Sequence, residues 1–566
     1  VIEFEQYSSE NIKEKIFEAY LNLGNIYYNL RSTAEAYHCY GKCIYSNGVN
    51  NEIYEAALCN YALINRLAQN AYANTMELLD SHIKKGTNHA KVISSYAALL
   101  YDTNQYKKAE EYLKPYNSIL KEANDLLSMI TPLPIVYDSQ SDIDRARNKL
   151  ESQLDNLLTQ KIVIPESELS IFTFFYLAYH NKNNKDILVK LSKFYEQTTP
   201  SILYTAKHCK KYKYSGKKIK LGIISNHLTP GHPVLKFMEN IINSFSNRNS
   251  YDLHIFTFSK KTQEIFSKNI HLLTSSSREQ RELISKYKLD IILYPEIGMH
   301  QGTYILAHAR LAPIQCMFGG HPVTTGIKNM DYYFSQKDLE VEGAQKHYSE
   351  ELVLFENFIA SYQKPEIPKK FISKSKLGLL KNRHNYLIPS KLQKIHPDFD
   401  KLLAGIVQKD DKALFIFFKD NGSNQWDDFV RKRLLKNLDK EYLVFRPWAD
   451  SETFYSLLHH TDAVLEPTVF GYGTTAIEAL SIGTPIITLP SDYPGGRIMQ
   501  AFYKKINFKE LIVTDMKEYI SQAIKLATDN SFKTYCKKSI LKSNKTLYEN
   551  SEVVDEIDIF FKKVLS

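Results

Sequence analysis

Residues 462–490 read DAVLEPTVFGYGTTAIEALSIGTPIITLP. Two short apolar runs that are typical of buried strands flank a turn rich in glycine and threonine and a helical segment. The first backbone N–H groups of a helix have no partner within the helix and lie at its positive end, where they can bind an anion. The hydroxyls of Thr474 and Thr475 add donors. The stretch therefore predicts a β–α–β unit with a phosphate-binding turn.

A structural interpretation of the same turn needs no ligand. Thr475 and Glu478 have the spacing of a capping box, in which two side chains bond to the free groups at the start of a helix. The turn is not a P-loop, because it lacks the GxxxxGK[ST] pattern and no lysine follows it. The residues alone leave phosphate binding and simple helix capping both open.

The alternation of strand and helix extends through the C-terminal part of the chain. KIKLGIIS, YDLHIFTF and DIILYP (218–295) form one set of apolar runs, and YLIP, ALFIFF, YLVFRP, DAVLEP and PIITLP (386–490) form a second. Helical segments separate the runs, which predicts parallel sheets with crossover helices. We expect two doubly wound α/β domains, 216–361 and 385–566, joined by a Pro- and Lys-rich hinge, with ligands in the cleft between them at the carboxyl ends of the strands.

The N-terminal part repeats. Y-x2-L-G-x2-Y at 20–27 and A-x3-Y at 36–40 match the tetratricopeptide pattern, and a related copy at 54–61 begins 34 residues after the first. A looser copy follows at 97–113. The pattern predicts about three repeats in residues 1–117, and such arrays often present a surface to proteins or peptides. Helical packing without a ligand is the alternative. Residues 118–215 are expected to form a helical connecting region.

Composition narrows the class of protein. The chain has 566 residues, 43% of them hydrophobic, with a formal net charge of +9. No apolar run reaches the roughly 18 residues of a membrane span, and no signal segment or nucleic-acid module is visible. The six cysteines form no CxxC pair, which favours free thiols over a metal site or a disulfide framework. We expect a cytoplasmic protein without a metal site, and interpret its lysine-rich connectors as solvated linkers or as an attraction for an anionic partner.

Several specific motifs occur in a recognisable order. Residues 310–326 contain R-x-A-P-I-Q and then G-x-P-x-T-T-G, with D-Y shortly after. HYSEELVLF (347–355), YLIPSKLQKIHPDFD (386–400) and the 470–485 turn follow, while FYLAYHNKNN (175–184) precedes them. In these motifs the chain resembles the O-GlcNAc transferase family, the tetratricopeptide-bearing glycosyltransferases. The resemblance implies a GT-B architecture, two Rossmann-like domains that use a nucleotide sugar, usually UDP-linked, and invert the anomeric centre in one displacement without an obligatory metal.

The resemblance also implies roles for individual residues. Lys394 aligns with the family's lysine at the leaving diphosphate, Thr474 and Thr475 with its paired threonines at the phosphates, and Glu478 with the acidic residue at the ribose. The base is expected against the backbone from Pro447 to Ala449. His232 matches a histidine near the reacting atoms, where it would be a general base or a hydrogen-bond donor, unless it is structural. His321, Pro322, Thr324 and Thr325 form the loop expected beneath the sugar, or else a tight turn with capped hydroxyls.

Three positions depart from the animal relatives. Gly473 stands where they carry a histidine, Lys391 where they carry a glutamine at the nucleotide, and Asp450 corresponds roughly to a lysine near the leaving phosphate. These differences put the identity of the donor in doubt.

The leading hypothesis is an enzyme that transfers a sugar, with GlcNAc the first choice, from a UDP-sugar to Ser or Thr of a protein bound by the repeats. Alternatives are an Asn-linked glucosyltransferase, a transferase that uses GDP-fucose or a CMP-linked nonulosonate, and an inactive repeat adaptor. The retention of His232, Lys394, Thr474 and Thr475 argues against the adaptor. Sequence leaves the oligomeric state open.

Overall fold

The computed structural model describes residues 10–29, 32–68, 72–122, 125–166, 169, 171–214, 216–357, 360–419 and 424–566. The chain forms two compact units. The first comprises Val1–Ile135 with Gly422–Trp426, and the second comprises Val136–Asn421 with Asp427–Ser566.

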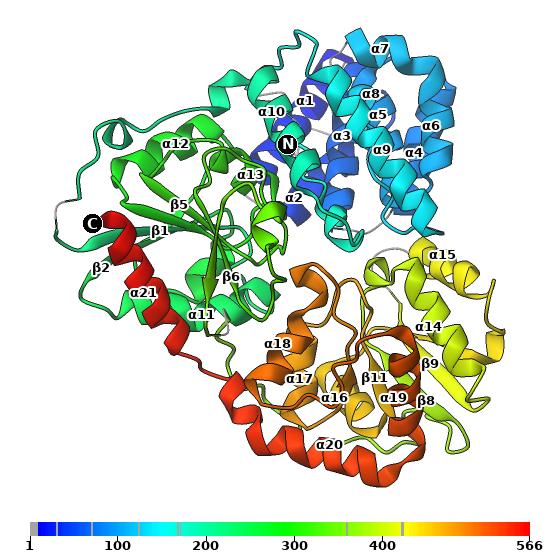
Figure 1. Ribbon diagram of the computed structural model, residues 1–566. Helices are drawn as coiled ribbons and strands as arrows, with labels where there is room; N and C mark the ends of the chain where they lie inside the picture. The colour runs from blue at the N-terminus through cyan, green and yellow to red at the C-terminus, as the bar shows by residue number, and fades with distance from the viewer. Residues whose placement is uncertain are drawn as a thin grey trace. The chain divides into compact units, whose positions relative to one another are not determined.

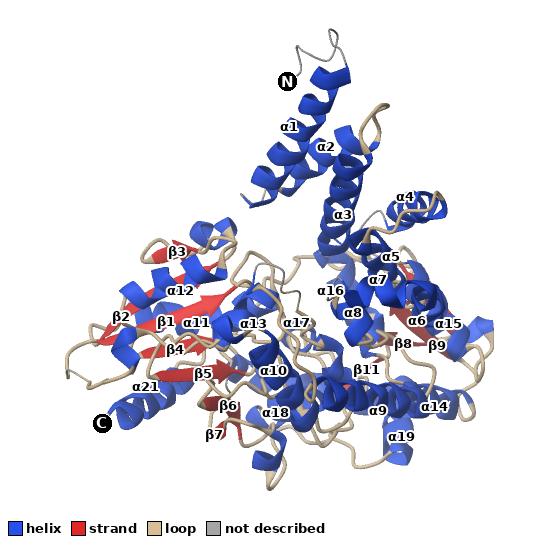
Figure 2. Ribbon diagram, turned by 90° about the horizontal axis from the view of Figure 1, so that it is seen from above, coloured by secondary structure: helices blue, strands red, loops and turns tan. Residues whose placement is uncertain are grey.

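The first unit is a series of paired helices. They are α1 (Glu10–Asn29), α2 (Thr33–Ile44), α3 (Asn51–Ala68), α4 (Tyr72–Lys84), α5 (Ala90–Asp102), α6 (Tyr106–Leu113), α7 (Asn117–Glu122) and α8 (Leu126–Met129). Successive helices pack side by side, α1 on α2 and α2 on α3 (Figure 2). Gly24 lets α1 and α2 approach, because a Cβ there would lie 2.6 Å from the ring of Tyr40. This arrangement agrees with the predicted tetratricopeptide-like solenoid.

The second unit begins with helices of the predicted connecting region, α9 (Gln140–Leu157) and α10 (Lys185–Thr198), and continues into a seven-stranded sheet. Its strands are β1 (Ile219–Ser225), β2 (Tyr251–Thr257), β3 (Ile270–Leu272), β4 (Ile291–Tyr294), β5 (Ile314–Phe318), β6 (Tyr332–Gln336) and β7 (Glu351–Phe355). Every neighbouring pair is parallel, in the order β3-β2-β1-β4-β5-β6-β7. Helix α12 (Ser277–Lys286) lies on one face and α11 (Pro233–Ser246) on the other (Figure 1); α13 (Gln301–Ala307) follows β4.

A second parallel sheet has five strands in the order β10-β9-β8-β11-β12. The strands are β8 (His384–Ile388), β9 (Ala413–Phe418), β10 (Leu443–Arg446), β11 (Ala463–Leu465) and β12 (Ile486–Ile487). The helices around it are α14 (Pro397–Val407), α15 (Asn424–Leu434), α16 (Ser451–His460), α17 (Thr474–Ser481), α18 (Ile498–Lys505), α19 (Met516–Thr528) and α20 (Asn530–Ser543). Two parallel, doubly wound sheets confirm the predicted GT-B class.

The last helix, α21 (Glu552–Leu565), packs on the first sheet although it follows the second sheet in the chain. Its buried side chains, Val553, Val554, Ile557 and Phe561 among them, join the core formed by the first sheet and α11. Figure 1 shows α21 beside α11. Residues 552–565 were expected to pack within the 385–566 domain, but they pack on the first sheet. An apolar helical stripe identifies a buried face but not the sheet that buries it.

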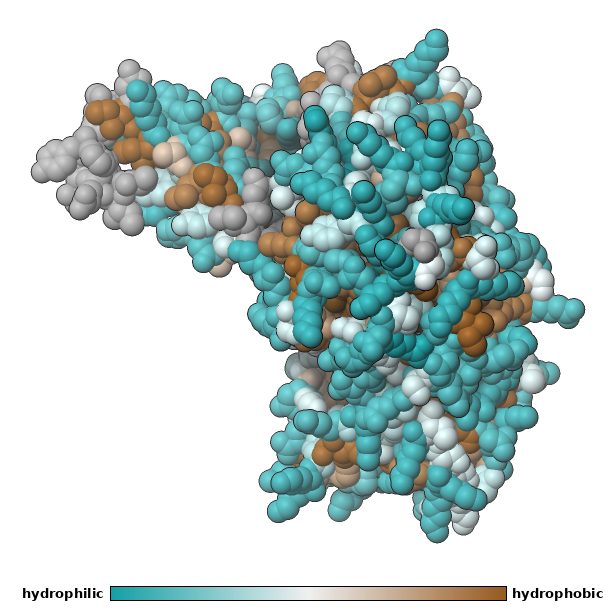
Figure 3. Space-filling model, turned by 90° about the vertical axis from the view of Figure 1, so that its left-hand side faces the viewer, coloured by the Kyte–Doolittle hydropathy of each residue, from teal (hydrophilic) through white to brown (hydrophobic). Residues whose placement is uncertain are grey.

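None of the described helices is long and apolar enough to cross a membrane. Hydrophilic residues cover most of the face shown in Figure 3. All six cysteines are free thiols, and no group of three or more His, Cys, Asp or Glu side chains in the described part of the chain could hold a metal ion.

Candidate active site

Each sheet has a point at which the strand order reverses. In the first sheet this point lies between β1 and β4, and in the second between β8 and β11. Loops that leave neighbouring strands in opposite directions open a crevice at such a point, which is where ligands bind in these folds. His232 follows β1, Lys391 and Lys394 follow β8, and Thr474 follows β11. The topology thus brings the predicted residues to the positions where a ligand is expected.

The phosphate-binding turn leads into α17, whose N-cap is Gly473. Glycine has no side chain to accept from the first N–H groups of the helix, and no side-chain cap forms. The predicted capping box is absent, because Thr475 is the second residue of the helix rather than its cap. Glu478 instead pairs with Lys236 of α11, at 3.1 Å between Nζ and Oε1. The hydroxyl of Thr474 is buried, and the side chain of Tyr362 is its neighbour. This helix end therefore keeps its capacity to bind an anion.

Lys394 ends a short 3-10 turn, Leu392–Lys394, after β8. Its ammonium nitrogen lies 4.5 Å from the centre of the Phe470 ring, a favourable cation–π contact. Among the described residues it makes no ion pair. Burial, reinforced by the charge of Lys391, lowers the pKa of Lys394 to about 8, and Glu466 opposes this effect. The side chain is still mostly charged at neutral pH, so the site contains a half-buried cation.

Glu466, which the sequence analysis did not identify, lies beneath the same turn. It directly follows β11 and its carboxylate accepts from the backbone N–H of Tyr472 at 2.7 Å. Burial raises the pKa of Glu466 to about 7. Gly471 is required here, since a Cβ would lie 2.3 Å from Oε1 of Glu466. The sequence feature that could have identified Glu466 is its position, since it is a carboxylate directly after the apolar run of DAVLEP (462–467).

On the side of the first sheet, His232 is the N-cap of α11. Its ring stacks on that of His227, with centroids 4.4 Å apart and planes 14° from parallel. Burial, with contributions from His227 and Lys391, lowers the pKa of His232 to about 4. Lys391 belongs to the second domain, so its electrostatic effect indicates that the two predicted residues lie near one another.

The predicted sugar loop is held by partners that were not predicted. His321 is buried and stacks on Phe175, with centroids 4.7 Å apart; burial lowers the pKa of His321 to about 3. The hydroxyl of Thr324 donates to Glu350 at 2.6 Å, and the backbone N–H of Thr325 donates to the same carboxylate at 2.7 Å. Both threonines thus form the tight, capped turn that was the structural alternative for them.

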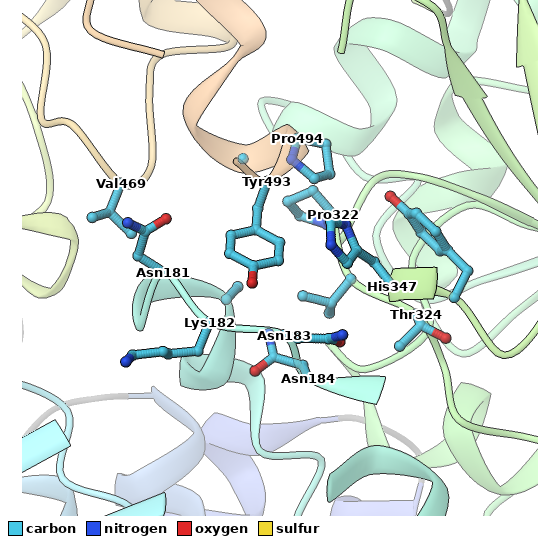
Figure 4. Close-up of a pocket in the computed structure, with 14 residues that line it drawn as sticks. Asn181, Lys182, Asn183, Asn184, Pro322, Thr324, His347, Val469, Tyr493 and Pro494 are labelled. Carbon is cyan, nitrogen blue, oxygen red and sulfur yellow. The ribbon is translucent and has the colours of Figure 1, made fainter. Parts of the chain in front are cut away.

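FYLAYHNKNN contributes directly to this region. Phe175 covers His321, and Tyr179 packs edge-on against Phe470, with centroids 4.9 Å apart, so that it supports the ring that carries Lys394. A small pocket adjoins this segment, with Asn181–Asn184 on one side and Tyr493 and Pro494 on another (Figure 4). Pro322 and His347 also line it.

Pro447 and Ala449 follow β10, which is the edge strand of the second sheet and is separated from β8 by β9. Trp448 between them is 55% exposed. Asp450 caps α16, accepting from the N–H of Thr453 at 2.8 Å. These residues therefore lie at the rim of the sheet, and Asp450 has a structural role.

Known proteins resemble this chain in sequence and in fold. Residues 362–556 match the model for glycosyl transferase family 41. A UDP-glucose:protein N-beta-glucosyltransferase of Actinobacillus pleuropneumoniae serotype 5b is 23% identical over 291 residues, 50% of this chain and 46% of the relative. A probable UDP-N-acetylglucosamine–peptide N-acetylglucosaminyltransferase SPINDLY of Solanum lycopersicum is 26% identical over 264 residues, 44% of this chain and 27% of the relative. The chain thus matches less than half the length of these relatives.

A solved structure resembles nearly the entire fold. A mutant of the Thermobaculum terrenum O-GlcNAc transferase aligns with a TM-score of 0.73 and 16% identity, covering 99% of this chain and 98% of that one. Residues 362–556 therefore match glycosyl transferase family 41 in sequence, and the chain shares its overall fold, of the GT-B class, with a solved O-GlcNAc transferase.

Proposed function

We propose that this protein transfers a sugar from a UDP-linked donor to a protein acceptor, with inversion at the anomeric carbon and without a metal. The observation that carries the proposal is the combination of Lys394 with the uncapped start of α17. A half-buried ammonium that forms no ion pair among the described residues, on the ring of Phe470 in the turn that precedes an uncapped helix start, suits a departing diphosphate.

The proposed roles follow from charge. As the glycosidic bond breaks, the electron pair leaves with UDP, and negative charge accumulates on its diphosphate. Lys394 and the N–H groups near Thr474 and Thr475 would stabilise that charge in a site with little water. Lys391 would contact the nucleotide, Glu478 the ribose, and the backbone from Pro447 to Ala449 the base. Glu478 would then exchange its partner Lys236 for the ribose hydroxyls.

GlcNAc and an acceptor Ser or Thr remain the first choice for sugar and linkage. A second candidate is glucose transferred to Asn, favoured by the match to a UDP-glucose:protein N-beta-glucosyltransferase over half of this chain. Residues 1–117 would bind the acceptor, while domains at 216–361 and 385–566, joined through 118–215 and the hinge, would carry out the transfer.

A screen of nucleotides and nucleotide sugars tests the proposal. UDP in EDTA should raise the melting temperature, since a ligand at 100 times its Kd stabilises the folded state by about 2.7 kcal/mol. GDP and CMP should have little effect. Comparing transfer from UDP-GlcNAc and UDP-glucose to Ser-, Thr- and Asn-containing proteins then separates the two candidates. UDP binding that vanishes in EDTA and returns with Mn²⁺ would contradict a metal-free site, and binding without hydrolysis or transfer would indicate an adaptor.

A further inference from the structure

Two histidines stack at the carboxyl end of β1, but their ring nitrogens have different partners. His227 lies two residues beyond the end of the strand, and His232 caps the helix that follows. Their ring centroids are 4.4 Å apart and the planes differ by 14°. A neutral histidine carries its proton on one ring nitrogen only, and the hydrogen bond made by the other nitrogen determines which one.

In His232 the nitrogen that accepts is Nδ1. It receives the backbone N–H of Val234 at 3.2 Å, which is the capping bond of α11. The proton of the neutral ring must therefore be on Nε2, where it can be donated but where no lone pair is available. The same use of Nδ1 recurs at two other helix starts, in His300 and His396. The cap thus makes His232 a hydrogen-bond donor towards any ligand.

His227 has the opposite arrangement. Among the described residues, no hydrogen bond to a helix start uses either nitrogen of its ring. Its Nε2 is buried and has no hydrogen-bond partner in the described part of the chain. No donor from these residues occupies this nitrogen, so its lone pair is available in the tautomer that carries the proton on Nδ1. Of the two stacked rings, only His227 has an unused proton acceptor.

We propose that His227 accepts the proton of the attacking group, and that His232 donates a hydrogen bond from Nε2 to the substrates. This inference rests on the proposed transfer. In the step, the acceptor oxygen forms a bond to the anomeric carbon while the bond from that carbon to the phosphate oxygen breaks. The electron pair leaves with UDP, and the proton of the acceptor hydroxyl moves to Nε2 of His227, which becomes an imidazolium.

Hydrogen bonds from buried groups hold the backbone around His227, as such a role requires. The buried carboxylate of Glu296 accepts from the hydroxyl of Ser225 at 2.9 Å and from the N–H of Asn226 at 3.0 Å. The hydroxyl of Ser225 in turn accepts from the N–H of His227 at 3.0 Å. Glu296 is a positioning residue in this arrangement, since it fixes the turn that presents the ring.

Burial favours a neutral His227 ring before the reaction. Burial lowers the pKa of His227, although the carbonyl of Met299 opposes the shift. The titratable groups around the two rings are each other, Lys391, Glu296 and His300, whose ring centroid is 6.4 Å from that of His227. Because the folded pKa lies below 6.5, the acceptor is available at neutral pH, and activity should fall only as the pH drops through that lower value.

Two matched substitutions separate the roles. His232→Asn keeps a good helix cap and a side-chain N–H donor, so it should lower kcat by less than about tenfold. His227→Asn removes the proposed titratable acceptor and should lower kcat by roughly 10²–10⁴-fold, with the affinity for UDP unchanged. The acidic limb of the pH profile should persist in His232→Asn and disappear from the residual activity of His227→Asn. The reverse pattern would overturn the assignment, as would a His227→Asn enzyme within threefold of wild type.

A second readout needs no substrate. Nitrogen-15 spectra of the histidine-labelled full chain, assigned through the same two variants, should show the Nε2–H form for His232 and the Nδ1–H form for His227. Exchanged forms would overturn the inference even in an active enzyme. Absence of UDP binding and of transfer from every nucleotide sugar would instead refute the proposed function, and with it the proton transfer, whatever the ring states.

Discussion

At the scale of single residues, Lys394 gives the sharpest test of the proposed chemistry. Lys394→Ala should lower kcat by roughly 10²–10³-fold, the usual cost of removing one strong transition-state donor, while UDP affinity changes much less. Lys394→Arg should restore part of the activity, because a planar guanidinium does not reproduce a compact ammonium. Single-turnover rates and UDP titrations on the folded variants measure both effects.

Lys391 is the matched comparison for this prediction. It is exposed and three residues away, and we expect it at the nucleotide, so Lys391→Ala should weaken UDP binding and leave kcat nearly unchanged. If Lys394→Ala turns over within a few-fold of wild type, the cation does not act on the leaving group. The sequence motif identified Lys394, but it gave no indication of Phe470 beneath its ammonium or of Glu466 nearby, since these contacts join separate turns.

At the scale of elements, the segment Phe175–Asn184 supports the site from outside both sheets. Phe175→Leu should remove the stacked ring from His321 and lower kcat/KM by about tenfold, because a small displacement of a positioned loop is costly to a reaction. Phe172→Leu is the control, since that half-buried ring contacts Phe174 and not the loop. Equal kinetics in the two variants, at similar melting temperatures, would show that the segment has no influence on the reaction.

The same scale shows why some expectations from sequence failed. Strand and helix periodicity correctly predicted the parallel sheets, because apolar runs and turns are local features. The capping box of Thr475 and Glu478 had the right spacing, but the helix begins at Thr474, and Glu478 pairs with Lys236, more than two hundred positions earlier in the chain. The packing of α21 on the first sheet likewise depends on contacts between residues far apart in the chain, which a local sequence pattern does not reveal.

At the scale of the whole molecule, the full chain can be used to test whether the first unit binds the acceptor while the second carries out the transfer. The 34-residue period correctly indicated paired helices, but it could not show that Gly422–Trp426 belongs to the first unit, where the indole N–H of Trp426 donates to the carbonyl of Asp102 at 3.0 Å. Deleting the repeats would expose this buried tryptophan and confuse the result. Point substitutions on the repeat helices avoid that problem.

Asn25 and Asn60 are suitable positions, because they lie on α1 and α3 and line a shallow depression with Tyr28, Tyr40 and Leu63. Asn60 donates to Asn25 at 2.9 Å, and amides so placed can bind the backbone of an extended peptide. If the first unit selects the acceptor and takes no part in the chemistry, replacing both by alanine should raise the KM for a protein acceptor by about tenfold. Hydrolysis of the donor and affinity for UDP should stay unchanged.

Alanine at the exposed Glu52 and Lys91 of the same unit controls for general surface effects. A folded Asn25 and Asn60 double variant that loses donor hydrolysis as well as transfer would contradict this division.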